Sequence, residues 1–199
     1  MNLEDPPRTT KGKRARERVL AEARRIIVEE GFDALSMREL AKRCDMQLGN
    51  LQYYVATRDA VAMAVISAEA EGDVSAVRAA IAKYGDPAAA LAAIVRTLFT
   101  RWRGESGLIF ATLVYLCQQK PEFVDLKERI YAAFYQALDT VTRSLDKKAT
   151  PKEVKLRVRL ITAIMDGSVL QVADSSRIFV EAVASTVLGI ARGDIGFGT

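Results

Sequence analysis

The stretch from Ser36 to Asp59 limits the possible fold more than any other part of this chain. Ser36 is followed three residues later by Glu39, which is the spacing of a capping box at the start of a helix. Apolar residues recur from Met37 at i+3, i+4 and i+7, the spacing of one helix face. A break at residues 44–46 separates this helix from a second, largely polar one expected over residues 47–53. Two short helices joined by a tight turn are typical of a helix-turn-helix, whose second helix enters the DNA major groove.

The remainder of the chain predicts further helices, because apolar residues keep helical spacing and no segment alternates like a strand. Asp86 and Thr150 each precede a proline and are expected to be N-caps, and Thr57 is expected to cap the helix after the motif. The segment from Leu108 to Cys117 is apolar all round, so we expect it to form a buried central helix. The predicted fold is all-α, with a three-helix helix-turn-helix domain followed by a larger helical C-terminal domain. The expected divisions are a disordered basic arm over residues 1–14, the DNA-binding domain over 15–61, and a C-terminal domain over 62–199.

Charge and composition narrow the class of protein. The net charge is only +4, but basic residues crowd the first eighteen positions, which suits contact with a phosphate backbone and equally suits a solvated tail. The two cysteines lie in apolar helical contexts and are expected to be reduced core residues. The absence of histidine argues against hydrolytic and zinc chemistry, so we expect no enzyme activity, metal or cofactor. No apolar leader or membrane-length run is present, which predicts a cytoplasmic protein with no membrane partner.

From Arg16 to Val65 the sequence resembles the DNA-binding region of TetR-family transcriptional regulators. The family pattern has an apolar helix, Gly-aromatic, a Ser or Thr cap, Leu-Ala, a small turn, and then Gly-x-Leu-Tyr-x-x-Phe-x-x-Lys. The matching residues follow in the same order without a gap: Gly31-Phe32, Ser36, Leu40-Ala41, residues 44–46, residues 49–55 and residues 57–59. Residues 165–168 are also similar to the Asp-Gly step in the family's penultimate helix.

Three residues depart from the family pattern. Asp45 stands where glycine is usual, and we expect it to adopt the left-handed conformation that aspartate enters readily. Gln52 replaces a tyrosine, and the neighbouring tyrosines are expected to compensate for that phosphate contact. Val55 replaces a phenylalanine, whose lost bulk Met46 is expected to supply.

The resemblance implies that the second helix of the motif reads bases. Amide side chains match the edge of adenine, leucine matches the thymine methyl, and a glycine permits close approach. Asparagine and glycine are poor helix formers, which favours a functional reason for their presence. The predicted base-reading residues are Gln47, Leu48, Gly49, Asn50 and Tyr53. The predicted phosphate contacts are Arg38, Gln52, Tyr54, Thr57 and Arg58.

The C-terminal part carries large side chains on apolar helix faces. They are interpreted either as core or, as the resemblance implies, as the lining of a ligand cavity in which an aspartate orients the ligand. The candidate ligand-binding residues are Phe99, Trp102, Phe110, Tyr115, Tyr131, Phe134, Met165 and Asp166.

Two apolar seams with near-heptad spacing mark the last two helices, one from Val154 to Val172 and one from Phe179 to Ile190. The resemblance implies that these helices form a four-helix interface in a homodimer, although the seams equally suit the monomer's own core. The implied function is a repressor that binds a pseudo-palindromic double-stranded DNA operator and is released by an unknown small-molecule effector. The alternatives are an adaptor or structural protein that keeps the helix-turn-helix shape without binding an operator, and an enzyme built on a helical bundle.

Overall fold

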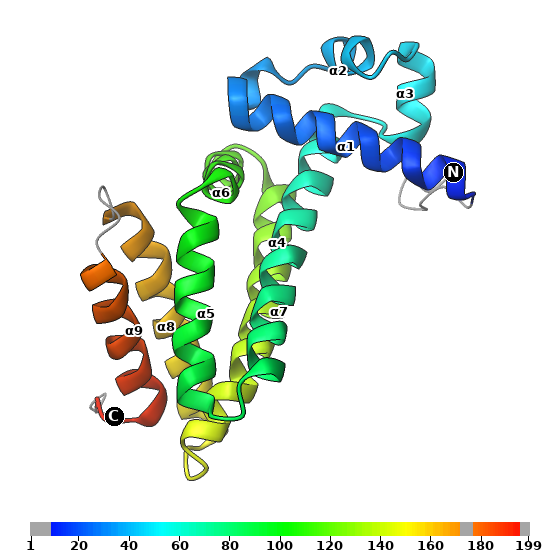
Figure 1. The fold of residues 1–199 in the computed structure, drawn as a ribbon. Coiled ribbons are helices and arrows are strands. Elements are labelled where there is room, and N and C mark those ends of the chain that lie inside the picture. Colours follow the sequence, from blue (N-terminus) through cyan, green and yellow to red (C-terminus); the bar gives the residue numbers. More distant parts are fainter. Residues whose placement is uncertain (1–8, 172–176, 196–199) are drawn as a thin grey trace. The chain divides into compact units, whose positions relative to one another are not determined.

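The computed structural model describes residues 9–171 and 177–195, and within these ranges it contains nine α helices, one 3₁₀ turn and no strand (Figure 1). This confirms the all-α prediction. The helices are α1 (Thr10–Glu30), η1 (Phe32–Ala34), α2 (Met37–Arg43), α3 (Leu48–Tyr54), α4 (Arg58–Lys83), α5 (Pro87–Trp102), α6 (Glu105–Cys117), α7 (Pro121–Leu145), α8 (Pro151–Gln171) and α9 (Arg177–Arg192). Within these residues, no helix is long and apolar enough to cross a membrane.

The predicted N-caps are confirmed by hydrogen bonds that fix where the helices begin. Thr57 Oγ1 accepts from the Ala60 amide at 3.1 Å, and Asp86 Oδ2 accepts from the Ala89 amide at 2.9 Å. Thr150 forms a full capping box, because Glu153 also accepts from its backbone amide at 2.7 Å. Local side-chain chemistry therefore sets these boundaries.

The capping box at the start of α2 is only half formed. Ser36 Oγ accepts from the Glu39 amide at 3.1 Å, as predicted. The Glu39 carboxylate is bound instead by Arg43 Nε, one turn later, at 2.8 Å. The reciprocal bond was wrongly predicted because a guanidinium at i+4 is a stronger partner for a carboxylate than a backbone amide.

The first helix begins earlier than the predicted limit of the basic arm. Thr9 Oγ1 accepts from the Gly12 amide at 3.1 Å and caps α1, so residues 10–14 are helical. Residues 10–14 were predicted to be disordered because they are mostly basic, and the capping role of Thr9 was not considered. Residues 1–8 of that arm, and Val172 of the predicted seam, lie outside the described residues.

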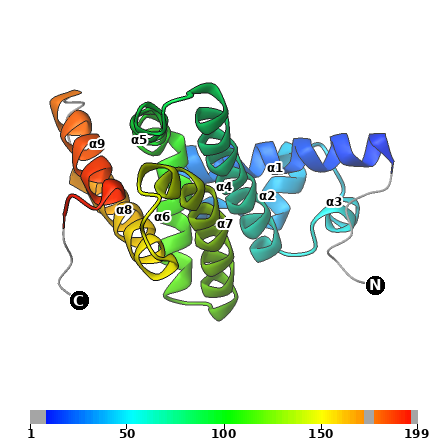
Figure 2. The same cartoon turned by 90° about the horizontal axis from the view of Figure 1, so that it is seen from below.

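The chain forms two compact units that are described separately. The first unit comprises the residues up to Glu69 together with 108–127, and the second comprises 70–107 together with the residues from Glu128 onward. The predicted boundary between residues 61 and 62 falls inside α4, which is a continuous helix without a linker. In the first unit, α1 packs with α2 and α3 (Figure 1); in the second, α5, α8 and α9 pack against one another (Figures 1 and 2).

The segment from Leu108 to Cys117 was predicted to be buried all round, but only one face of this helix is buried. Ile109, Leu113 and Leu116 are buried on one face of α6, but Leu108 and Val114 are 50% and 59% exposed. A run that is apolar all round leaves the direction of burial undefined, and the surroundings of α6 cover only one face.

Candidate nucleic-acid interface

The turn between α2 and α3 sets the angle of the second helix. Asp45 has a φ of 52°, the left-handed conformation predicted for the residue that stands in place of glycine. The amides of Asp45 and Met46 donate to the carbonyls of Lys42 and Ala41 at 3.1 and 2.9 Å. Arg18 of α1 donates to the Cys44 carbonyl at 3.2 Å. Backbone hydrogen bonds and a side chain from the first helix therefore hold the turn.

A small apolar core fixes α3 against the rest of the motif. Leu51 is fully buried and is the only buried residue of α3, and Leu40 of α2 is also fully buried. Val55, which follows α3, is 5% exposed and fills part of the same domain's core. The other side chains of α3 therefore remain available on its outer surface.

The predicted base-reading residues occupy that outer surface. Gln47, Gly49 and Asn50 are exposed, Tyr53 is 69% exposed, and Leu48 is half-buried. A Cβ atom built on Gly49 meets no atom within 4 Å, so the backbone there is open to close approach. The Tyr53 ring packs edge-on against Tyr54 at a centroid distance of 5.3 Å. This geometry suits a helix inserted into the major groove.

Four of the predicted phosphate contacts lie on the motif or directly beside it. Arg38 on α2 and Gln52 on α3 are exposed, whereas Tyr54 is half-buried. Thr57 is exposed, although its hydroxyl oxygen is used as the cap of α4.

The Arg58 side chain makes contacts within the first unit that were not predicted. Its Nη2 donates to the Phe32 carbonyl at 2.6 Å, and its guanidinium carbon lies 3.9 Å from the centroid of the Phe32 ring. A weaker contact reaches Asp33 Oδ1 at 3.4 Å. Arg58 therefore clamps the start of α4 to the turn after α1. The phosphate contact of Arg58 stays a prediction, and the contact with Phe32 was not predicted because the two residues are 26 positions apart in the sequence.

Ion pairs that were not predicted connect elements of the first unit. Arg43 of α2 binds both carboxylate oxygens of Glu30 at 2.6 and 2.9 Å, which lowers the pKa of Glu30. Arg24 of α1 pairs with Glu69 of α4 at 2.8 Å. The two residues of each pair lie on different elements. The spacing of charges along a single helix therefore could not predict these ion pairs.

A further ion pair connects the start of α4 to the turn between α6 and α7. Lys120 Nζ lies 2.5 Å from Asp59 Oδ2, and both residues belong to the first unit. The helix that follows the helix-turn-helix motif is thus tied to a residue 61 positions away in the sequence.

The predicted ligand residues do not all come together. In the second unit, Phe99, Phe134 and Met165 are buried in one apolar core, and Trp102 packs against it at 6.1 Å from the Phe134 ring. Trp102 also donates its indole N–H to Asp73 Oδ2 at 2.5 Å. Phe110 and Tyr115 belong instead to the first unit, and Tyr115 is 47% exposed.

Tyr131 and Asp166 form the polar part of this set. The Tyr131 hydroxyl donates to Asp166 Oδ2 at 2.7 Å. Burial raises the pKa of the Asp166 carboxyl group, and the hydrogen bond from Tyr131 opposes that shift. The pair joins α7 to α8 and stands beside Tyr135, whose ring centroid is 5.8 Å from that of Tyr131.

The predicted apolar seams of the last two helices close the second unit's own core. Val154, Val158, Ile161 and Met165 of α8 are all buried in that core, as are Val183 and Ile190 of α9. Phe179 is half-buried and Thr186 is exposed. The seams therefore belong to the monomer's own core, which was the alternative to a dimer interface in the sequence-based prediction.

Comparison with known proteins agrees with this geometry. Residues 19–69 match the model of the bacterial regulatory proteins of the tetR family. No curated protein shows significant sequence similarity to the chain. Solved structures with the same fold include a transcriptional regulator from Rhodococcus sp. Rha1, with 23% identity over 90% of this chain and 95% of that one and a TM-score of 0.70.

Two further structures show the same likeness. A TetR transcriptional regulator from Legionella pneumophila is 16% identical over 94% of this chain and 97% of its own, with a TM-score of 0.67. The fatty acid degradation regulator FadR from Bacillus halodurans is 17% identical over 88% of this chain and 95% of its own, with a TM-score of 0.73. At these identities the likeness establishes the fold.

Proposed function

Because this chain belongs to the TetR family of bacterial regulatory proteins and is a DNA-binding transcriptional regulator, we propose that it is a repressor released from its operator by a small-molecule effector. The observation that carries the proposal is the outer face of α3. Amide side chains, a tyrosine and a glycine are exposed on this face. Leu51 is the one residue of α3 that is buried in the core. A face of this kind contributes little to folding and suits recognition.

Base reading is assigned to Gln47, Leu48, Gly49, Asn50 and Tyr53. The Asn50 amide offers a donor and an acceptor to the matching edge of adenine, and Leu48 offers an apolar contact to a thymine methyl group. The open backbone at Gly49 lets α3 lie deep in the groove.

Phosphate contacts are assigned to Arg38, Gln52, Tyr54 and Thr57, with support from the basic residues at the start of α1. Lys11, Lys13 and Arg14 are exposed there, and their helical placement gives them fixed directions that a disordered arm lacks. Arg58 is left out of this set because its guanidinium group is engaged by Phe32.

A homodimer through α8 and α9 remains part of the proposal, but on different faces from the predicted seams. On α8, Leu156, Ala163 and Gly167 are exposed at i, i+7 and i+11, and a Cβ atom built on Gly167 meets nothing within 4 Å. On α9, Ile178 is 82% exposed, and Ala182 and Ser185 follow it at i+4 and i+7. Apolar and small residues along two packed helices suit a four-helix interface, and a twofold dimer matches a pseudo-palindromic operator.

We assign to α4 and its ion pairs the coupling between effector binding and DNA binding. Asp59 and Lys120 couple the first turn of α4 to the turn between α6 and α7, and Arg24 and Glu69 couple α1 to α4. An effector that binds one arrangement of these helices more tightly shifts the population away from the state that binds DNA.

Selection of duplexes from a random or genomic library by the full-length protein tests the proposal. The expected product is a pseudo-palindrome whose half-sites are separated by about one helical turn or a multiple of it, with affinity that falls steeply as salt rises. Enrichment of no duplex at low salt would refute operator binding and would favour the adaptor alternative.

A further inference from the structure

The turn that leads into α3 receives one side-chain hydrogen bond from outside the α2–α3 pair. Within residues 9–171 and 177–195, Arg18 of α1 is the one residue outside this pair whose side chain hydrogen-bonds the turn at residues 44–46. Arg18 Nη2 donates to the Cys44 carbonyl at 3.2 Å across 26 positions of sequence. The first helix also packs against both α2 and α3 (Figure 1). Arg18 therefore connects α1 directly to the turn that precedes the proposed base-reading helix.

The acceptor of this hydrogen bond lies at the C-terminal end of α2. Cys44 is the C-cap residue of that helix. Carbonyl groups in the last turn of a helix have no partner within the helix, and basic side chains satisfy them favourably at the negative end of the helix dipole. Arg18 fills this role from a different helix.

The same carbonyl belongs to the peptide group that makes the turn strained. Cys44 has a ψ of 0° and Asp45 has a φ of 52°. A rotation of the peptide plane between them by about half a turn would give Asp45 the negative φ that L residues prefer. That rotation would also turn the Cys44 carbonyl away from Arg18. The Arg18 hydrogen bond thus favours the orientation that requires the left-handed conformation of Asp45.

The direction of α3 depends strongly on this turn because little else fixes the helix. Leu51 is its only buried side chain, and a helix of seven residues is too short to be stable alone. A change in the peptide group at residues 44–45 therefore redirects α3 and moves its exposed side chains.

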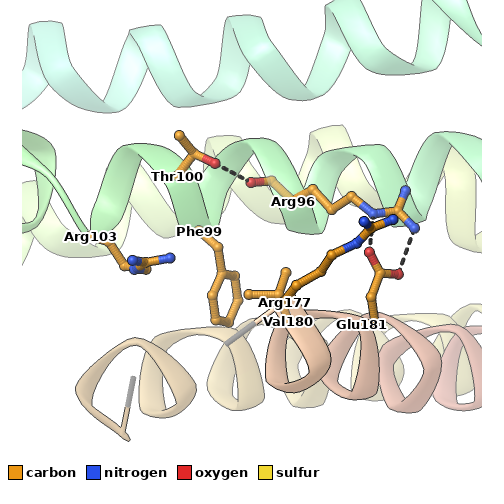
Figure 3. A pocket seen from close by; sticks show the side chains of 7 residues that line it. All are labelled: Arg96, Phe99, Thr100, Arg103, Arg177, Val180 and Glu181. Atoms are coloured by element: carbon orange, nitrogen blue, oxygen red, sulfur yellow. Dashed lines mark hydrogen bonds and ion pairs between the residues drawn. The ribbon is translucent and has the colours of Figure 1, made fainter. Parts of the chain in front are cut away.

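This contact differs in kind from the arginine pair that joins α5 to α9. In the second unit, Arg96 of α5 donates to both carboxylate oxygens of Glu181 of α9, each at 2.7 Å (Figure 3). That pair connects the ends of two side chains. Arg18 instead binds a backbone carbonyl, so its hydrogen bond acts on the orientation of a peptide group.

We propose that Arg18 is a positioning residue for base reading. Its hydrogen bond to the Cys44 carbonyl keeps Asp45 left-handed and so sets the direction of α3, without contact between Arg18 and DNA. This inference rests on the proposed reading of bases by α3. It gives Arg18 a role distinct from that of Lys11, Lys13 and Arg14, which are assigned to phosphate contact.

Hydrogen exchange in the free full-length protein tests the effect on the turn. Arg18→Met removes the donor but keeps a long side chain with good helix propensity. We expect the amides of Met46 and Leu51, which are hydrogen-bonded in the turn and in α3, to exchange several-fold faster in this variant. Amides in the middle of α1 are expected to keep their exchange rates. Arg14→Met, at an exposed arginine one turn earlier, is the matched control and is expected to change none of these rates.

Affinity for the duplex that the parent protein selects tests the effect on base reading. Removal of a phosphate contact reduces the salt slope by about one, and this is expected for Arg14→Met. Arg18→Met is expected to weaken binding about tenfold with an unchanged salt slope. In the Arg18→Met background, Asn50→Ala is expected to cost less than about threefold, against about tenfold in the parent, because a redirected α3 no longer places Asn50 on its base.

Asp45→Gly provides a rescue that only the positioning role predicts. Glycine adopts the left-handed conformation without steric cost, so the turn no longer needs the Arg18 hydrogen bond to hold it. We expect Asp45→Gly to restore most of the affinity and base preference lost in Arg18→Met. The same change in the Arg14→Met background removes the same charge and is expected to give no comparable gain.

Three results would overturn the inference. The first is exchange of the Met46 and Leu51 amides at parental rates in Arg18→Met. The second is faster exchange throughout α1, which would show a general structural role. The third is a reduced salt slope in Arg18→Met with an undiminished effect of Asn50→Ala, which would make Arg18 a phosphate contact. If the parent selected no duplex, operator binding would fail by itself, and the exchange rates would still decide whether Arg18 holds the turn.

Discussion

Replacement of Arg58 separates a structural clamp from a phosphate contact. A hydrogen bond from a charged group contributes about 1.5–3 kcal/mol, and a cation over an aromatic ring contributes about 0.5–2 kcal/mol. The Arg58 side chain is 37% exposed and its buried Nε lacks a hydrogen-bond partner, so both values are reduced. We therefore expect Arg58→Ala to lower the free energy of unfolding by about 2 kcal/mol.

The Lys variant at the same position tells the two roles apart. Arg58→Lys keeps the positive charge that a phosphate requires but loses the planar group that lies on the Phe32 ring and reaches its carbonyl. Under the clamp interpretation, Arg58→Lys loses most of the stability that Arg58→Ala loses.

Urea unfolding followed by circular dichroism measures the change, with Arg38→Ala as the matched control. Arg38 is an exposed arginine of the same unit, and its removal is expected to change stability by less than about 0.5 kcal/mol while weakening DNA binding. The clamp would be refuted if both Arg58 variants kept the unfolding midpoint of the parent protein. If DNA affinity were then lost only in Arg58→Ala, the role of Arg58 would be a phosphate contact.

Three further predictions follow from the motif and the last two helices. Asn50→Ala is expected to relax base preference at one operator position by about 1–3 kcal/mol, and a duplex selection that returns an unchanged motif would contradict this. Asp45→Val is expected to cost about 1–2 kcal/mol of stability in urea unfolding because of the left-handed backbone, whereas Asp45→Gly is expected to be tolerated. Ala182→Asp is expected to yield a helical monomer in sedimentation, whereas Val183→Asp, at a buried position, is expected to unfold the second unit; a dimeric Ala182→Asp would exclude the proposed interface.

Features set by neighbouring residues were predictable from the sequence. The caps at Thr57, Asp86 and Thr150 and the left-handed turn at Asp45 depend on a few consecutive residues, and each was found as predicted. The all-α fold followed from periodicity, which is also a local property.

Features set by distant packing were not predictable in the same way. The seams of α8 and α9 have the spacing of an interface, but spacing does not distinguish a monomer core from a contact between two copies. The direction in which α6 is buried depends on which helices surround it. Arg58 and Phe32 are 26 residues apart, and only the folded chain shows that they meet.

The way α3 is anchored has a consequence for its base preference. This seven-residue helix is too short to be stable alone, and Leu51 is its only buried side chain. Positions 49, 50, 52 and 53 are exposed, so substitutions there meet few packing constraints. The proposed base preference of α3 is thus open to change by substitutions that leave the packing of the scaffold unaltered.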